Sequence, residues 1–145
     1  DYRINSIKNF IFKNNNYNLK KIAKKNFLKN VKILGHKKNV TNYLNDSHLL
    51  MYLPRTDSSW GRNIIESLCN GVPVITCGKS NLLIKDKING YFLKEYNQNK
   101  ILKLIIGLYK NRKQLARMSI DAKKIALLKY QKNRITDKFI DFIEN

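Results

Sequence analysis

Short apolar runs alternate along the chain with segments in which apolar residues recur at helical spacing. Four of the runs predict short strands, over residues 31–34, 48–53, 73–76 and 91–93. Their apolar character is nearly continuous, as is typical of parallel strands that are covered on both faces. The other segments predict helices by their periodicity, over residues 16–27, 39–44, 61–69, 101–108, 115–125 and 135–143. This alternation predicts an α/β fold, a Rossmann-like open parallel sheet with helices on both faces.

Turn residues mark the ends of several of these elements. Asn39 can cap the brief helix that follows it. Asn70 and Gly71 close the helix over 61–69 with a left-handed residue, a conformation that glycine adopts without steric cost. We expect Asn89 and Gly90 to supply the positive φ of a tight turn before the last strand.

In open α/β sheets, ligands bind beyond the carboxyl ends of the strands. Three loops follow predicted strands there, at residues 35–38, 54–61 and 77–81. The loop from Pro54 to Gly61 is the most informative, because the free N–H groups and dipole of the helix it enters favour an anion such as phosphate. Gly61 has no side chain and so admits a ligand closely. Arg55 and Arg62 flank the loop with charges that pair with phosphate oxygens.

Glu66 lies on the flank of this helix, away from its apolar face. A carboxylate there can accept hydrogen bonds from two neighbouring sugar hydroxyls. A simpler alternative stays open for each residue near the loop. Arg62 and Glu66 are four apart and can form an exposed helix pair worth about 0.3–0.5 kcal/mol. Arg55 can be a solvated charge, and Trp60 can be a core aromatic that pins the loop.

The chain of 145 residues carries a formal net charge of +19, from 29 basic and 10 acidic residues. One interpretation is a polyanionic partner such as nucleic acid or anionic lipid. The other is codon bias, because Lys, Asn, Ile and Tyr are all read from A/T-rich codons. We favour codon bias, since the charges are spread along the chain, whereas binding patches cluster. A modest attraction to anionic membrane surfaces is expected under both interpretations.

Cys69 and Cys77 belong to no CxxC or Cys/His motif, so we expect free thiols and no metal site. No apolar run approaches the roughly 18 residues of a membrane-spanning helix. The first residues show no basic start followed by an apolar stretch, so they do not resemble a secretory signal. We therefore expect a cytoplasmic protein, either free or at the inner face of the membrane.

Four segments occur in a characteristic order, at residues 31–36, 53–55, 60–75 and 86–93. The third has an aromatic-Gly pair, then Glu66, a helix with small residues and a Gly-x-Pro-Val sequence. Together they resemble the C-terminal domain of retaining GT-B glycosyltransferases of the group 1 type. The resemblance extends over roughly residues 16–145, and the order of the segments makes it specific.

The resemblance implies transfer of a sugar from a nucleotide-diphosphate donor to an acceptor, without a cofactor or a metal ion. It implies that Glu66 binds the ribose hydroxyls and that nearby loop amides hold the diphosphate and donor sugar. Ser58 stands where the family has a glutamate that touches the donor sugar, and Asp57 is the neighbouring acid that can replace it. The site residues implied are Ser58 and Asp57 as catalytic residues, and Glu66, Gly61, Arg62, Arg55, Gly35 and His36 as donor-binding residues.

Only the later part of the family's domain is matched, so we expect residues 1–145 to be a partial C-terminal nucleotide-sugar-binding domain, inactive alone. Residues 1–15 lack the family's strand with a glycine-flanked Arg and Lys, and the N-terminal acceptor domain is absent. The expected partners are a nucleotide-sugar donor, a saccharide or lipid-linked acceptor of cell-envelope polysaccharide synthesis, and an anionic membrane, but no nucleic acid. Three alternatives stay open: a sugar-nucleotide epimerase of the same fold, a non-catalytic relic, and a basic nucleic-acid-binding module.

Overall fold

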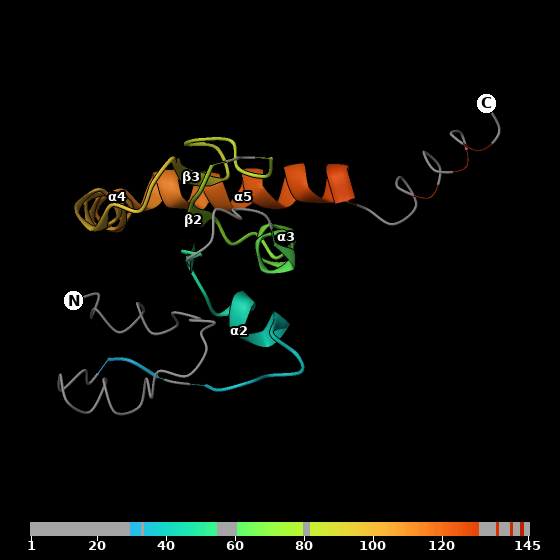
Figure 1. The fold of residues 1–145 in the computed structure, drawn as a ribbon, viewed down its shortest axis with the longest axis horizontal. Helices are drawn as coiled ribbons and strands as arrows, with labels where there is room; N and C mark the ends of the chain where they lie inside the picture. Colours follow the sequence, from blue (N-terminus) through green and yellow to red (C-terminus); the bar gives the residue numbers. More distant parts are fainter. Residues whose placement is uncertain are drawn as a thin grey trace.

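A computed structural model describes residues 30–32, 34–54, 61–79 and 82–130, together with Thr136, Ile140 and Ile143. Its elements, shown in Figure 1, are α2 (Thr41–Asn45), β1 (Leu50–Tyr52), α3 (Arg62–Cys69), β2 (Val74–Cys77), β3 (Gly90–Leu93), α4 (Gln98–Lys110) and α5 (Arg112–Tyr130). The helix predicted over 16–27 lies outside the described residues. Of the last predicted helix, the three described residues are helical.

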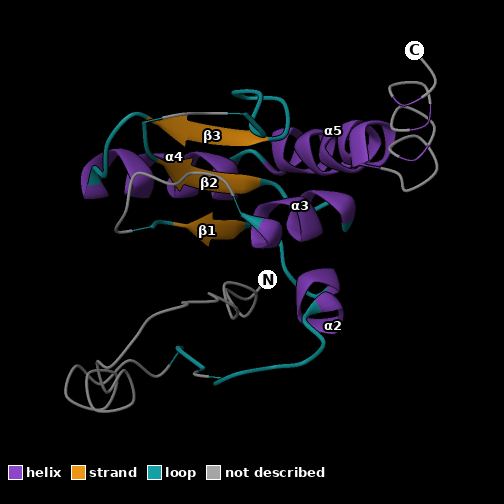
Figure 2. Cartoon of the chain, turned by 45° about the vertical axis from the view of Figure 1, so that its right-hand side comes forward, coloured by secondary structure: helices purple, strands orange, loops and turns teal. Residues whose placement is uncertain are grey.

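The described strands form one parallel sheet in the order β1-β2-β3. Met51 lies opposite Ile75, and Ile75 lies opposite Tyr91. All four residues of the central strand β2 are buried. Helices α3 and α4 lie on opposite sides of the sheet (Figures 1 and 2). The predicted open parallel sheet with helices on both faces is therefore confirmed.

One apolar cluster lies on each face of the sheet. The first cluster contains Phe92 and the second contains Tyr91, and adjacent residues of a strand point to opposite faces. Helix α5 contributes to both clusters. Leu115 and Met118 pack with Leu108 of α4. Its second half packs against α3 through the fully buried Ala122 and Ala126, whose small side chains let the two helices approach closely. This long helix thus ties the two faces together.

Helix α3 ends in a Schellman motif, as the pair Asn70 and Gly71 predicts. Gly71 has φ +72°, and its N–H donates to the carbonyl of Leu68 at 2.9 Å. The N–H of Val72 donates to the carbonyl of Ser67, also at 2.9 Å. The Ser119 hydroxyl of α5 donates to the carbonyl of Gly71 at 2.6 Å, so the end of α3 is also held from outside.

The strand predicted over 31–34 is not formed at its described residues, Val31, Lys32 and Leu34. Val31 is exposed and Leu34 is only half-buried, so this apolar run has neither a neighbouring strand nor a covering helix at these positions. The third strand of the described sheet is instead the run predicted over 91–93, extended by one residue to Gly90. A short apolar run becomes a strand only where it finds a hydrogen-bonded edge.

The turn before β3 is not built as predicted, because its positive φ belongs to Lys87, at +61°, and not to Asn89 or Gly90. Gly90 is required for a different reason. A Cβ atom at this position would overlap the backbone carbonyl oxygen of Val74 in β2. The glycine therefore permits the close approach of two strands.

Candidate functional site

The carboxyl edge of the sheet brings together the residues that end the strands and the first turn of α3. Leu53 and Pro54 follow β1 and are half-buried, as is Gly61 at the start of α3. The N–H of Gly78 donates to the carbonyl of Leu93 at 3.0 Å and so joins the ends of β2 and β3. This edge is where an open parallel sheet binds its ligand.

Gly61 is the N-cap of α3, with extended backbone at φ −174°. It offers no side-chain acceptor to the first helical turn, whose N–H groups are therefore not capped from that position. The Tyr52 hydroxyl at the end of β1 lies against Gly61, since a Cβ atom there would be 3.4 Å from the hydroxyl oxygen. A helix start without a side-chain cap from Gly61, together with the positive end of the helix dipole, forms a setting suited to an anion.

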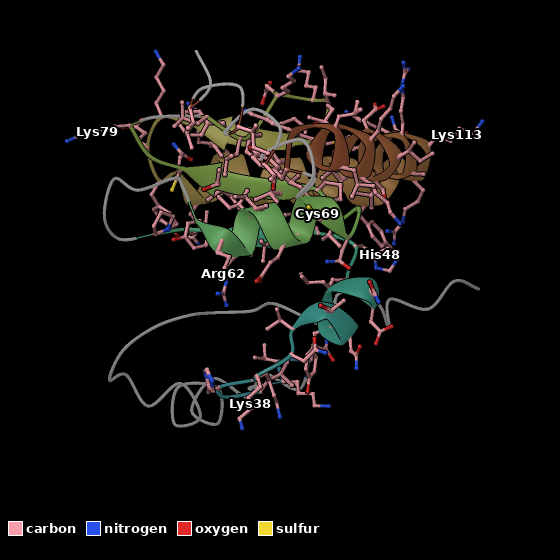
Figure 3. All side chains as sticks on the ribbon, turned by 90° about the vertical axis from the view of Figure 1, so that its right-hand side faces the viewer. Lys38, His48, Arg62, Cys69, Lys79 and Lys113 are labelled. Carbon is pink, nitrogen blue, oxygen red and sulfur yellow. The ribbon has the colours of Figure 1, made fainter. Side chains whose placement is uncertain are left out.

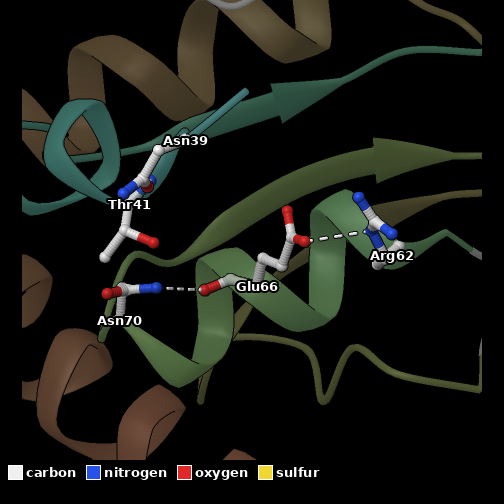
Figure 4. Close-up of polar contacts among 5 residues, drawn as sticks. All are labelled: Asn39, Thr41, Arg62, Glu66 and Asn70. Atoms are coloured by element: carbon white, nitrogen blue, oxygen red, sulfur yellow. Dashed lines mark hydrogen bonds and ion pairs between the residues drawn. The ribbon is translucent and has the colours of Figure 1, made fainter. Parts of the chain in front are cut away.

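Glu66 and Arg62 form an ion pair on α3, with Arg62 Nε 3.0 Å from Glu66 Oε1 (Figure 4). The Arg62 side chain is 88% exposed and that of Glu66 33% exposed. Asn70 Nδ2 also donates to the Glu66 carbonyl at 2.7 Å, which fixes the backbone of this residue. Glu66 leaves the apolar face of its helix, as predicted. It pairs with Arg62, which is the alternative to ligand binding that the spacing of four residues left open. An exposed pair of this kind is easily broken by a ligand, because it is worth only about 0.3–0.5 kcal/mol.

Thr76 is a polar residue that the pattern of the sequence did not single out. It is fully buried near the end of β2, between Tyr52 and Phe92 in the register of the sheet. Among the residues that the structure describes, its hydroxyl has no hydrogen-bond partner. The only signal for it in the sequence is a threonine within the apolar run 72–77, one residue before the strand ends.

The other predicted site residues are not gathered at this edge by the described structure. Gly35, with φ +66°, and His36 are both exposed. They belong to a segment that lies beyond α2 from the sheet, where Figure 3 places Lys38 apart from Arg62. Arg55, Asp57 and Ser58 lie outside the described residues, as does Trp60. Of the predicted site, the structure therefore places Gly61, Arg62 and Glu66 together on one helix.

Both cysteines are free, as predicted. Burial raises the pKa of the Cys69 and Cys77 thiols above the ordinary value, because the charged thiolate is less well solvated there. A raised pKa reduces the thiolate fraction at neutral pH and with it the reactivity of both groups. In the described part of the chain, no three His, Cys, Asp or Glu side chains come together in a way that could hold a metal ion.

A groove of about 500 Å³ lies away from the carboxyl edge. Leu68 at the end of α3, Lys85 and Asn89 before β3, and Ala126 and Tyr130 of α5 are among the residues that line it. The Tyr130 hydroxyl is buried and has no hydrogen-bond partner among the described residues. None of the predicted site residues lines this groove, so it is separate from the candidate site.

The family model described as "Glycosyl transferases group 1" matches residues 4–125 of the chain. The chain belongs to this family. The matched range includes β1, β2 and α3, and α3 with its N-cap carries Gly61, Arg62 and Glu66. It begins before the range over which the sequence resembles the family and ends within α5.

Solved structures of glycosyltransferases share the fold of this group 1 domain. HepE of Anabaena, crystallised with UDP, is 18% identical with a TM-score of 0.78, over 87% of this chain and 35% of HepE. A variant of S. aureus TarM was crystallised with fondaparinux, alpha-GlcNAc-glycerol and UDP. It is 25% identical with a TM-score of 0.71, over 88% of this chain and 26% of TarM. The C-terminal domain of the group 1 protein LpcC from Francisella tularensis is 15% identical with a TM-score of 0.66, over 79% and 61%.

The chain thus spans about a third of HepE and a quarter of TarM. A comparison with curated protein sequences finds no match. Within the described residues of this group 1 domain, no helix is both long enough and apolar enough to cross a membrane.

Proposed function

We propose that this group 1 domain binds a nucleotide-diphosphate sugar and that the intact protein transfers the sugar to an acceptor. The observation that carries the proposal is the start of α3. There a helix N-terminus to which Gly61 offers no side-chain cap, at the carboxyl edge of a parallel sheet, is followed by a third-exposed carboxylate, Glu66. The helix end suits the diphosphate, and the carboxylate suits two neighbouring ribose hydroxyls.

The chemistry asks for stabilisation of the leaving diphosphate as charge develops on it. In this proposal the amides of the first turn of α3 supply positive potential without a metal ion or cofactor, and Arg62, whose exposed pair with Glu66 is weak, adds a cation. Ser58 and Asp57 are the candidates for the sugar-facing role, with Arg55, Gly35 and His36 as further donor-binding residues. Retention of the sugar's configuration belongs to the same proposal.

HepE and TarM, which share this fold, were both crystallised with UDP, and HepE also with UDP-glucose. These complexes favour a uridine diphosphate sugar as the first donor to test. The acceptor in the proposal is a saccharide or lipid-linked molecule of cell-envelope polysaccharide synthesis. The proposed enzyme is cytoplasmic, and the excess of basic residues supports its peripheral association with an anionic membrane.

The experiment is calorimetric titration of the intact protein with UDP, UDP-glucose and matched GDP and ADP sugars. The proposal expects saturable binding of at least one nucleotide sugar, together with release of its nucleoside diphosphate when an acceptor is added. Binding without release under any acceptor would show a non-catalytic relic. Interconversion of two nucleotide sugars without transfer would show an epimerase. Absence of all binding would overturn the proposal.

A further inference from the structure

Helix α4 exposes an apolar stripe that no described element covers. Leu102 is 53% exposed, Ile106 43% and Tyr109 38%. These residues stand at positions i, i+4 and i+7, so they lie on one face of the helix. Ile101 and Leu108 on the other face are buried, which accounts for the attachment of α4 to the sheet. The stripe, defined here as Leu102, Ile106 and Tyr109, is therefore surplus to the core.

The charge around the α4 stripe is of one sign. The chain from Tyr96 to Ile120 contains six basic residues and no acidic residue. Lys103 and Lys110 are exposed on the same helix as the stripe. The guanidinium of Arg112 lies over the Tyr109 ring, 5.0 Å from its centroid, so one cation is held directly at the end of the stripe. This local run contrasts with the even spread of charge that the whole sequence suggests.

We propose that the α4 stripe docks the protein on an anionic membrane surface. A helix with apolar residues on one face and flanking lysines lies in the plane of such an interface, with its apolar side chains among the acyl chains. Lysine side chains extend from the apolar boundary to reach lipid phosphates, and tyrosine is favoured at that depth. Charge complementarity favours the membrane as the occupant, because the cations beside the stripe match the negative surface of an anionic leaflet.

Docking through α4 is compatible with sugar transfer at the carboxyl edge. Helix α4 starts after β3 and runs back along the sheet. Its C-terminal end therefore lies near the opposite edge of the sheet from the start of α3. Figure 3 places Lys113, just after this end, on the opposite side of the domain from Lys79, which follows β2. The inference deepens the membrane association in the proposed function, but it does not depend on donor binding.

The test is co-sedimentation of the intact protein with vesicles of phosphatidylcholine alone or with about one-third phosphatidylglycerol. We expect binding only to the anionic vesicles. Leu102→Gln and Ile106→Gln should each weaken it by about three- to tenfold, the factor that follows from burying a partly exposed aliphatic side chain. Ile88→Gln is the matched control, because Ile88 is also 43% exposed but lies in the turn before β3. This variant should bind as the wild type does.

Equal vesicle binding by Ile106→Gln and wild type would overturn the inference, because the attraction to the vesicles would then come from charge alone. Absence of binding to the anionic vesicles would overturn it as well. So would a dimer, seen by analytical ultracentrifugation, that Ile106→Gln dissociates, because a second copy would then cover the stripe. Titration of the same variant with the nucleotide sugar should give wild-type affinity, which separates a failure of the docking surface from a failure of the proposed function.

Discussion

At the scale of single residues, Asn89 organises the segment that leads into β3. Its side chain is fully buried, with Nδ2 donating to the Leu83 carbonyl at 3.1 Å. Its Oδ1 accepts from the N–H of Lys85 at 2.7 Å. These two bonds satisfy a buried carbonyl and a part-buried N–H of the backbone. The sequence suggested a turn residue here, whereas the structure shows a bridge between three parts of one loop.

Asn89→Ala should lower the free energy of unfolding by about 2 kcal/mol, because it leaves the buried Leu83 carbonyl and the part-buried Lys85 N–H without their side-chain partners. Urea denaturation followed by circular dichroism measures the change. Asn99→Ala on the exposed side of α4 removes the same group without burial, and its effect should stay within about 0.5 kcal/mol. Similar losses in both variants would show that the Asn89 hydrogen bonds contribute little.

At the scale of elements, the sequence predicts what depends on local pattern. The apolar runs at β1, β2 and β3, the spacing in α3 to α5 and the cap at Asn70 and Gly71 are all confirmed. In the candidate site the same is true of Gly61 at the start of α3 and of the spacing between Arg62 and Glu66. Each of these depends on residues within a few positions of one another.

What could not be predicted depends on distant neighbours. The run over 31–34 has the composition of a strand, but nothing local states whether an edge is available to pair with it. The role of Gly90 follows from the approach of Val74, which is far away in the sequence. The Thr76 hydroxyl has no partner among the described residues, which likewise depends on the side chains that surround it. Such contacts exist only once the sheet is assembled.

Gly90→Ala should destabilise the protein by at least about 2 kcal/mol, because the added methyl group meets backbone that cannot move aside without separating β2 from β3. The control is Gly107→Ala in α4, where a Cβ atom meets nothing within 4 Å. Alanine is the better helix former by about 0.5–1 kcal/mol, so this variant should be more stable than the wild type. Thermal melts of the two variants should therefore shift in opposite directions. A shift of the same sign in both would contradict the account of β2–β3 packing.

At the scale of the whole molecule, the chain spans only part of the length of the structures that share its fold. It matches structures of glycosyltransferases over about nine-tenths of its own length but over only a third of HepE. The excess of positive charge belongs to this scale too, and we expect it to attract anionic surfaces rather than to form a base-reading groove.

Duplex DNA should bind only weakly to the intact protein at physiological salt, despite the net charge of +19. Fluorescence anisotropy with a labelled duplex over a salt series measures both the affinity and its salt dependence. Because much of the charge is spread along the chain, we expect a slope equivalent to fewer than about six phosphate contacts. A steeper slope with tight binding would favour the nucleic-acid-binding alternative.

The most direct test of the central claim is the affinity of the intact protein for its best nucleotide sugar after Glu66→Gln. The change keeps the shape of the side chain but removes its charge, and a hydrogen bond to a charged group contributes about 1.5–3 kcal/mol. Calorimetric titration should show binding weakened roughly tenfold to a hundredfold, with little change in the urea midpoint. Asp86→Asn, which removes an exposed carboxylate before β3, should leave the affinity unchanged. Equal affinity in Glu66→Gln and wild type would contradict the assignment of a donor site to the start of α3.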